Sequence, residues 1–136
     1  MIGGAQLVAC AVLGCWLGAC SPQGLTAQQS AARVARAIEV LRNAPNPDKA
    51  GPLAALTALG CTGPDVCETR DACQLGYALH VEAVTLTLRA KEQLRDGKTP
   101  QAAKFLITAQ EKLSEASRKV ADCADREAAL RHRYKL

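Results

Sequence analysis

Residues 73–123 decide the fold, and they read CQLGYALHVEAVTLTLRAKEQLRDGKTPQAAKFLITAQEKLSEASRKVADC. At the centre of this stretch, Gly97 can stop one helix in the left-handed conformation, and Pro100 can start the next. Helical patterns flank this turn and predict helices at about 66–96 and 100–133. Because the turn is short, the two helices should lie side by side in an antiparallel hairpin.

The register of this hairpin follows from distance to Lys98, the middle of the turn. Large residues then lie largely opposite small ones, as in Val120 opposite Gly76, which favours closely packed helices. His80 lies in the same interface, where a hydrogen-bonded boundary histidine is the simpler interpretation and a ligand or base is the alternative. On the helix expected at about 100–133, the residues that face the interface recur at alternating steps of four and three: Ala102, Leu106, Ala109, Leu113, Ala116, Val120, Cys123. The same line continues through Glu127, Leu130 and Tyr134.

Two shorter helices are expected before the hairpin. The first, at about 26–43, starts with the capping-box pair Thr26 and Gln29 and carries one apolar stripe. The second, at about 51–59, has a proline in its first turn and a glycine at its end. These patterns predict an all-α fold, a small bundle of about four helices over residues 26–136 with a long C-terminal hairpin.

The start of the long third helix has two candidate caps. Thr62 and Asp65 both precede its apolar pattern, and both residue types accept hydrogen bonds from the free N–H groups of a first turn. We therefore expect one of these two side chains to cap that helix.

Composition excludes several classes of protein. The chain has 136 residues, 49% of them hydrophobic and 3% aromatic, which argues against a wholly disordered chain and against a sheet protein. Its net charge is +4, which is too mild and too evenly spread to indicate a nucleic-acid partner.

The N-terminal stretch 1–19 contains no charged residue and ends in small residues, as export signals do. Its last residues, Leu17-Gly18-Ala19 followed by Cys20, resemble the lipobox of bacterial lipoproteins. The resemblance implies cleavage before Cys20, diacylation of its thiol and acylation of the new amine. Residues 20–25 would then form the lipidated cysteine and a short tether.

The destination of the protein also follows from this resemblance. In lipoproteins, a serine such as Ser21 after the lipidated cysteine permits transfer to the outer membrane. The resemblance therefore implies a bacterial cell-envelope protein, lipid-anchored in the outer membrane and facing the periplasm, with the bilayer as its first partner. The alternatives are lipidation at Cys15, which follows a similar motif, or an uncleaved signal anchor.

The seven cysteines divide into groups under this interpretation. Two leave with the signal and one is lipidated, so four remain in an oxidising compartment, where disulfides form. Because Cys73 and Cys123 are equally distant from Lys98, we expect them to pair, which leaves Cys61 to pair with Cys67. The rival pairing, Cys67 with Cys123 and Cys61 with Cys73, needs a shifted hairpin register.

Metal binding and catalysis have weaker support. The spacing of the four cysteines lacks the CxxC pattern of structural zinc sites and of redox proteins, although a mixed site with His80 is conceivable. No catalytic triad, phosphate loop or carboxylate pair stands out. We therefore expect no enzyme activity, no catalytic residue, no cofactor and no metal site.

The C-terminal run is basic and ends in Arg131, Arg133 and Lys135. Cations in the last turn of a helix complement its dipole, which explains the run without a partner. The functional alternative is contact with an anionic envelope polymer or an acidic protein.

The stretch Leu25-Thr26-x-x-Gln29 resembles the LTxxQ pattern of periplasmic helical chaperones and stress sensors. The main expectation remains a non-enzymatic structural or protein-interaction component of the envelope. A chaperone-like or a ligand- or metal-sensing protein is the alternative.

Overall fold

The computed structural model describes residues 24–136. The expected signal at 1–19, the lipidation site Cys20 and the tether up to residue 23 lie outside the described residues. The described chain is all-helical, as predicted, and its elements follow in the order α1 (Ala27–Asn43), the 3-10 turn η1 (Asn46–Asp48), α2 (Ala50–Ala58), α3 (Pro64–Arg95) and α4 (Thr99–Tyr134).

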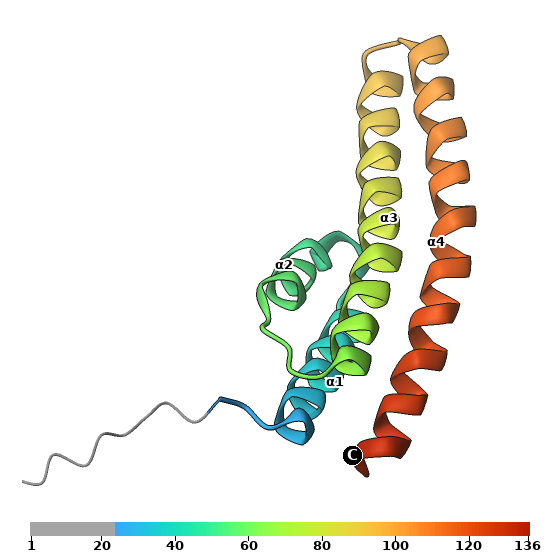
Figure 1. Ribbon diagram of the computed structural model, residues 1–136. Coiled ribbons are helices and arrows are strands. Elements are labelled where there is room, and N and C mark those ends of the chain that lie inside the picture. The colour runs from blue at the N-terminus through green and yellow to red at the C-terminus, as the bar shows by residue number, and fades with distance from the viewer. Residues whose placement is uncertain (1–23) are drawn as a thin grey trace, which may run out of the picture.

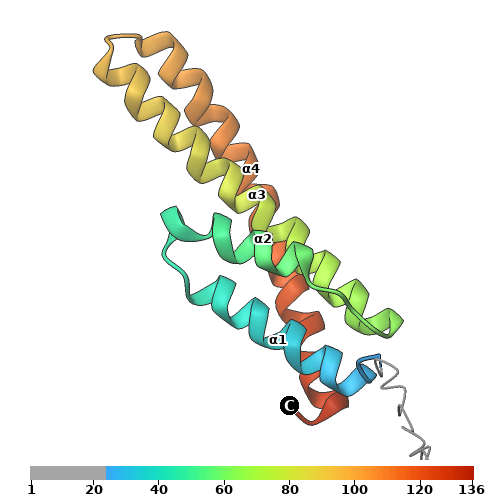
Figure 2. The same ribbon diagram turned by 90° about the vertical axis from the view of Figure 1, so that its left-hand side faces the viewer.

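The long pair α3 and α4 forms the predicted antiparallel hairpin (Figure 1). Its turn contains Gly97 at φ 72°, a left-handed conformation that glycine adopts without steric cost. Helices α1 and α2 lie against only one half of the hairpin, near the C-terminus, so the other half extends beyond them (Figure 2). We call this free half, residues 84–95 of α3 and 99–113 of α4, the arm, and the rest of the described molecule the base.

The two hairpin helices pack closely, in the expected register. A Cβ atom on Gly76 would lie 2.9 Å from the backbone carbon of Lys119 and 2.9 Å from the nitrogen of Val120. Gly76 therefore lies opposite Val120, as predicted. The buried line of α4 that faces α3 repeats every seven residues and is made mostly of small side chains: Ala102, Ala109, Ala116, Cys123, Leu130.

The expectation that Leu106 and Leu113 would lie in this interface is wrong. Leu106 is 45% exposed and Leu113 is 38% exposed. The small alanine side chains let the two helix backbones approach each other closely. The leucines four residues after Ala102 and Ala109 therefore lie at the edge of the interface. At the base, neighbouring elements cover that edge, and Val120 packs against the core there. Along the arm, no other element of residues 24–136 covers it.

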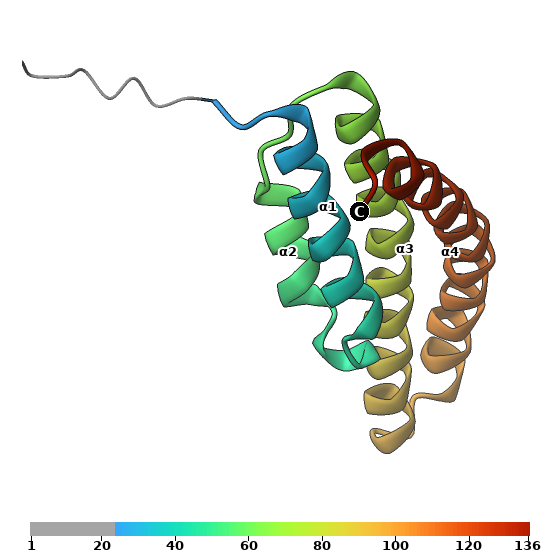
Figure 3. The same cartoon turned by 90° about the horizontal axis from the view of Figure 1, so that it is seen from below.

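The core lies in the base, where all four α-helices meet. Figure 3 shows α1 and α2 together on one side of the α3–α4 pair. The predicted apolar stripe of α1 is buried against that pair. Its members join residues of the other three helices in one cluster: Ala31, Val34, Ile38, Leu41, Leu56, Val66, Cys73, Tyr77, Cys123, Leu130.

Of the two predicted helix caps, the one at the start of α1 is confirmed and the one at the start of α3 is not. The predicted capping box of α1 is present, since the Gln29 N–H donates to Thr26 Oγ1 and the Thr26 N–H donates to Gln29 Oε1. The prediction that Thr62 or Asp65 caps α3 is wrong. Gly63, at φ 97°, is the cap residue and Pro64 is the first helical residue, so Asp65 already lies inside the first turn.

Two disulfides brace the fold, in the pairing expected from the hairpin register. Cys73 and Cys123 join α3 to α4 inside the core, with their Cα atoms 4.6 Å apart. Cys61 and Cys67 join the α2–α3 connection to the first turns of α3, with a Cα separation of 5.3 Å. The rival pairing does not occur.

Candidate functional site

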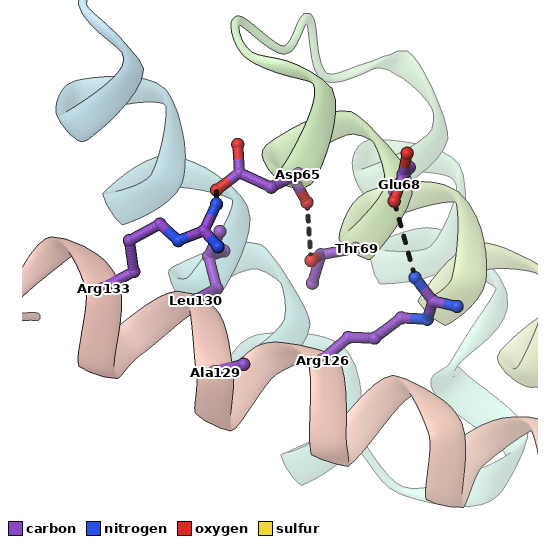
Figure 4. A pocket seen from close by; sticks show the side chains of 7 residues that line it. All are labelled: Asp65, Glu68, Thr69, Arg126, Ala129, Leu130 and Arg133. Carbon is purple, nitrogen blue, oxygen red and sulfur yellow. Dashed lines mark hydrogen bonds and ion pairs between the residues drawn. The ribbon is translucent and has the colours of Figure 1, made fainter.

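A shallow pocket of about 150 Å³ lies between the first turns of α3 and the last turns of α4 (Figure 4). Its charged side chains already hold one another. Arg133 Nη1 lies 2.9 Å from Asp65 Oδ2, and Arg126 Nη1 lies 3.7 Å from Glu68 Oε2. The lining consists of polar, charged and small apolar residues: Asp65, Glu68, Thr69, Arg126, Ala129, Leu130, Arg133. The pocket is therefore a joint between two helices rather than a receptive site.

Asp65 is the centre of this joint. It accepts a hydrogen bond from the Tyr134 hydroxyl at 3.2 Å, in addition to the one from Arg133. Burial alone would raise the pKa of Asp65, but these two hydrogen bonds lower it below its ordinary value. Asp65 therefore stays ionised and ties the end of α4 to the start of α3.

A second joint at the base is built around Glu127, which is only 3% exposed. Its carboxylate accepts hydrogen bonds from Arg42 of α1 and, at 2.9 Å, from Arg131 of α4. Burial opposes the charge of Arg42, but the contact with Glu127 outweighs this and raises the pKa of Arg42. The sequence signal for this contact was the position of Glu127, a charged residue within an apolar stripe. The sequence did not indicate that Arg42 is its partner.

The C-terminal basic residues are largely engaged within the chain. Arg131 bonds Glu127 and lies 3.7 Å from Glu39, and Arg133 bonds Asp65. Of the three residues expected to contact an anionic partner, only Lys135 forms no ion pair with another described residue. The charges of Arg131 and Arg133 serve to hold α4 against α1 and α3.

Lys49 is a buried cation that the sequence analysis did not identify. Its Nζ donates to the carbonyl oxygens of Leu41 and Arg42, at 2.8 Å each, and lies 5.6 Å from the centre of the Tyr77 ring. Burial lowers the pKa of Lys49. Since those carbonyls belong to the last turn of α1, Lys49 caps that helix from the following segment.

His80 lies beside η1, where its Nε2 donates to Asn46 Oδ1 at 3.0 Å. Burial, and then the positive charge of Lys49, lower the pKa of His80 below its ordinary value. The four cysteines that could have formed a mixed metal site with His80 are all in disulfides. Within residues 24–136, no group of three or more His, Cys, Asp or Glu side chains is placed to hold a metal ion.

The arm carries most of the exposed large apolar side chains of the described chain. Five of the eight lie on it: Leu88, Leu94, Leu106, Ile107, Leu113. The buried residues of the arm are alanines, and of its leucines and isoleucine only Leu86 is half-buried while the other five are exposed. Exposed apolar side chains on a protruding element are candidates for contact with another molecule. No helix in the described part of the chain has the length and apolar character needed to cross a bilayer.

No protein-family model matches this chain, and no curated protein or solved structure is significantly similar to it.

Proposed function

We propose that this protein is a lipid-anchored component of the bacterial cell envelope that acts by binding another envelope protein, without catalysing a reaction. The anchor is Cys20, on the strength of the lipobox-like sequence Leu17-Gly18-Ala19-Cys20. Helix α1 begins at Ala27, so the folded body would follow the lipid after only a few residues. Two or three acyl chains give durable attachment, because each buried methylene contributes about 0.8 kcal/mol.

The two disulfides support an extracytoplasmic location. Disulfides persist in oxidising compartments such as the bacterial periplasm and are rare in the cytosol. Both bridges lie in the part of the chain that would remain after cleavage before Cys20. In a reducing compartment the same four cysteines would be free thiols, and the two bridges would be lost.

The arm is the observation that supports a binding role. The start of α1 lies next to the end of α4, where Gln28 Nε2 donates to the Tyr134 carbonyl oxygen at 3.3 Å. The arm lies at the opposite end of α3, a helix of 32 residues that is about 48 Å long. An anchor just before α1 would therefore hold the base near the membrane and leave the arm free to reach a partner.

Labelling with radioactive palmitate in a bacterial host tests the anchor. We expect the label on the wild-type protein, no label on Cys20→Ala, and full label on the control Cys15→Ala. Unchanged labelling of Cys20→Ala would reject the anchor. Loss of the label in Cys15→Ala alone would move the lipidation site to that cysteine.

A chaperone-like role is the second candidate, because exposed apolar side chains on the arm are also what a holdase needs to bind unfolded chains. A light-scattering assay with a heat-aggregating client protein separates the two. A holdase suppresses aggregation of unrelated clients, whereas a specific binding protein does not.

A further inference from the structure

Helix α1 packs on one face of the α3–α4 pair at the base, and no described helix lies on the continuation of that face along the arm (Figure 2). On α4, the carboxylate of Glu127 contacts Arg42 of α1. Tyr134, seven residues further on, packs against the core and accepts a hydrogen bond from Gln28 at its backbone carbonyl. Val120 continues this line and packs against the core that α1 helps to form. The same seven-residue step then leads to Leu113 and Leu106, which are exposed on the arm.

The α3 side of this face follows the same pattern. Tyr77 is buried in the core of the base and lies under Lys49. One seven-residue step further is Val84, and one helical turn beyond that is Leu88, which is 48% exposed. Tyr77 and Val120 both face the core that α1 helps to form, so their continuations along α3 and α4 lie on one face of the hairpin. We call Val84, Leu88, Leu106 and Leu113 the arm strip.

The charge around the arm strip is positive. A shallow hollow beside Leu88 is lined by two cations, Lys91 and Arg95, and by one carboxylate, Glu92. Neither cation forms an ion pair with another described residue. Over the whole arm, with the turn between its helices, six basic residues stand against three acidic ones: Arg89, Lys91, Arg95, Lys98, Lys104 and Lys112 against Glu92, Asp96 and Glu111. This excess disfavours a second copy of the arm as the occupant, since like charges would repel.

We propose that the arm strip binds an acidic amphipathic helix of a partner protein, on the same face of the hairpin that α1 covers at the base. An apolar stripe on such a helix would cover the arm strip, as the stripe of α1 covers the core. Its acidic residues would meet Lys91 and Arg95, which fixes the chemistry of the partner. This inference rests on the proposed function and names the partner class for it.

A peptide pair derived from α1 tests this assignment. The acidic probe is the sequence of residues 27–43 with Arg33, Arg36 and Arg42 replaced by glutamate, and the matched probe keeps the three arginines. Fluorescence anisotropy measures binding of each labelled peptide to the purified, disulfide-bonded protein at low salt. We expect the acidic probe to bind at least about ten-fold more tightly than the arginine probe.

Variants of the arm locate the binding. The pair Leu88→Ser and Leu106→Ser should weaken binding of the acidic probe at least about ten-fold. The pair Lys91→Glu and Arg95→Glu should weaken it similarly and remove its salt dependence. The control Leu75→Ser, at a leucine that is 49% exposed but lies outside the arm, should leave binding unchanged. Because all these side chains are exposed, far-UV circular dichroism should show native helix content in each variant.

Three results would overturn the proposal. The first is equal binding of the two probes, or binding that the Leu88→Ser and Leu106→Ser pair does not weaken. The second is tight binding to phosphatidylglycerol vesicles that the same pair abolishes while neither probe binds, which would make the arm a lipid-binding surface. The third is a homodimer in analytical ultracentrifugation that the same pair dissociates.

The peptide assay and the palmitate assay fail independently. If Cys20 is not acylated, the arm still binds the acidic probe, because the purified protein needs no lipid for that contact. If the arm does not bind the probe while Cys20 is acylated, the anchor stands and the partner assignment falls.

Discussion

Gly76 allows the backbones of α3 and α4 to approach each other at the base. A side chain there would meet main-chain atoms of Lys119 and Val120 rather than the movable end of a side chain. The cost of a glycine inside a helix, about 0.5–1 kcal/mol relative to alanine, is therefore offset by close packing of the two helices.

Substituting alanine for Gly76 should destabilise the protein. Overpacking costs about 1–3 kcal/mol, which exceeds the gain in helix propensity. We expect a lower midpoint in urea unfolding followed by circular dichroism, with an unchanged slope.

Gly60→Ala is the control, since a Cβ atom at Gly60, in the connection between α2 and α3, meets nothing within 4 Å. This substitution should be neutral or should stabilise the protein by up to about 1 kcal/mol. Equal destabilisation by the two substitutions would show that Gly76 is not a contact point.

His80 should make stability depend on pH near neutrality. Its pKa is lowered in the folded state, so the unfolded chain binds the proton more tightly. Stability is therefore full above the ordinary histidine pKa of about 6.5 and falls as the pH drops through that value. The lowered pKa of Asp65 acts in a separate, more acidic range, because stability from Asp65 is lost only as the pH falls below the ordinary aspartate pKa.

Thermal melts of the wild type and of His80→Asn, from about pH 7.5 down to about pH 5.5, measure this effect. The melting temperature of the wild type should fall more over this range than that of the variant. Parallel curves for the two proteins would remove His80 as the cause.

At the scale of elements, the two disulfides constrain the chain to different extents. Cys73 and Cys123 are 50 residues apart and join the two hairpin helices, whereas Cys61 and Cys67 are 6 residues apart. A longer closed loop removes more conformational entropy from the unfolded chain.

Removing each bridge by a pair of alanine substitutions should show this difference. We expect a loss of about 4 kcal/mol for the Cys73–Cys123 pair and about 2 kcal/mol for the Cys61–Cys67 pair. Urea unfolding of the oxidised proteins measures both values. The same protein unfolded in the presence of a reductant is the control, and a larger loss for the Cys61–Cys67 pair would contradict the prediction.

At the scale of the whole molecule, the base and the arm differ in how they are held together. Every member of the core cluster lies in the base, while the buried residues of the arm are the three alanines Ala90, Ala102 and Ala109. Segments with few buried apolar contacts open more often. The arm is therefore the less stable part of the hairpin, which suits an element that receives a partner helix.

Amide hydrogen exchange should reveal this gradient. Peptides from the arm should exchange at least about ten-fold faster than peptides from α3 and α4 at the base. Addition of the acidic probe should slow exchange in the arm and leave the base unchanged. Uniform protection along both helices would contradict the division into base and arm.

The sequence alone determined the helices, the hairpin and its register. These features depend on local patterns: a capping box at Thr26, a turn at Gly97, and residues at equal distances from Lys98. The disulfide pairing followed from the same register, because two long antiparallel helices leave little freedom in which residues lie opposite.

Only the tertiary structure decided which side of the hairpin α1 covers and where that cover ends. That choice buries Glu127 and pairs it with Arg42, turns Arg133 toward Asp65, and leaves Leu106 on the surface. The periodicity of one helix shows which residues share a face, but it does not show which distant element packs on that face. The partners of the buried charges and the exposed arm therefore depend on contacts between segments far apart in the chain.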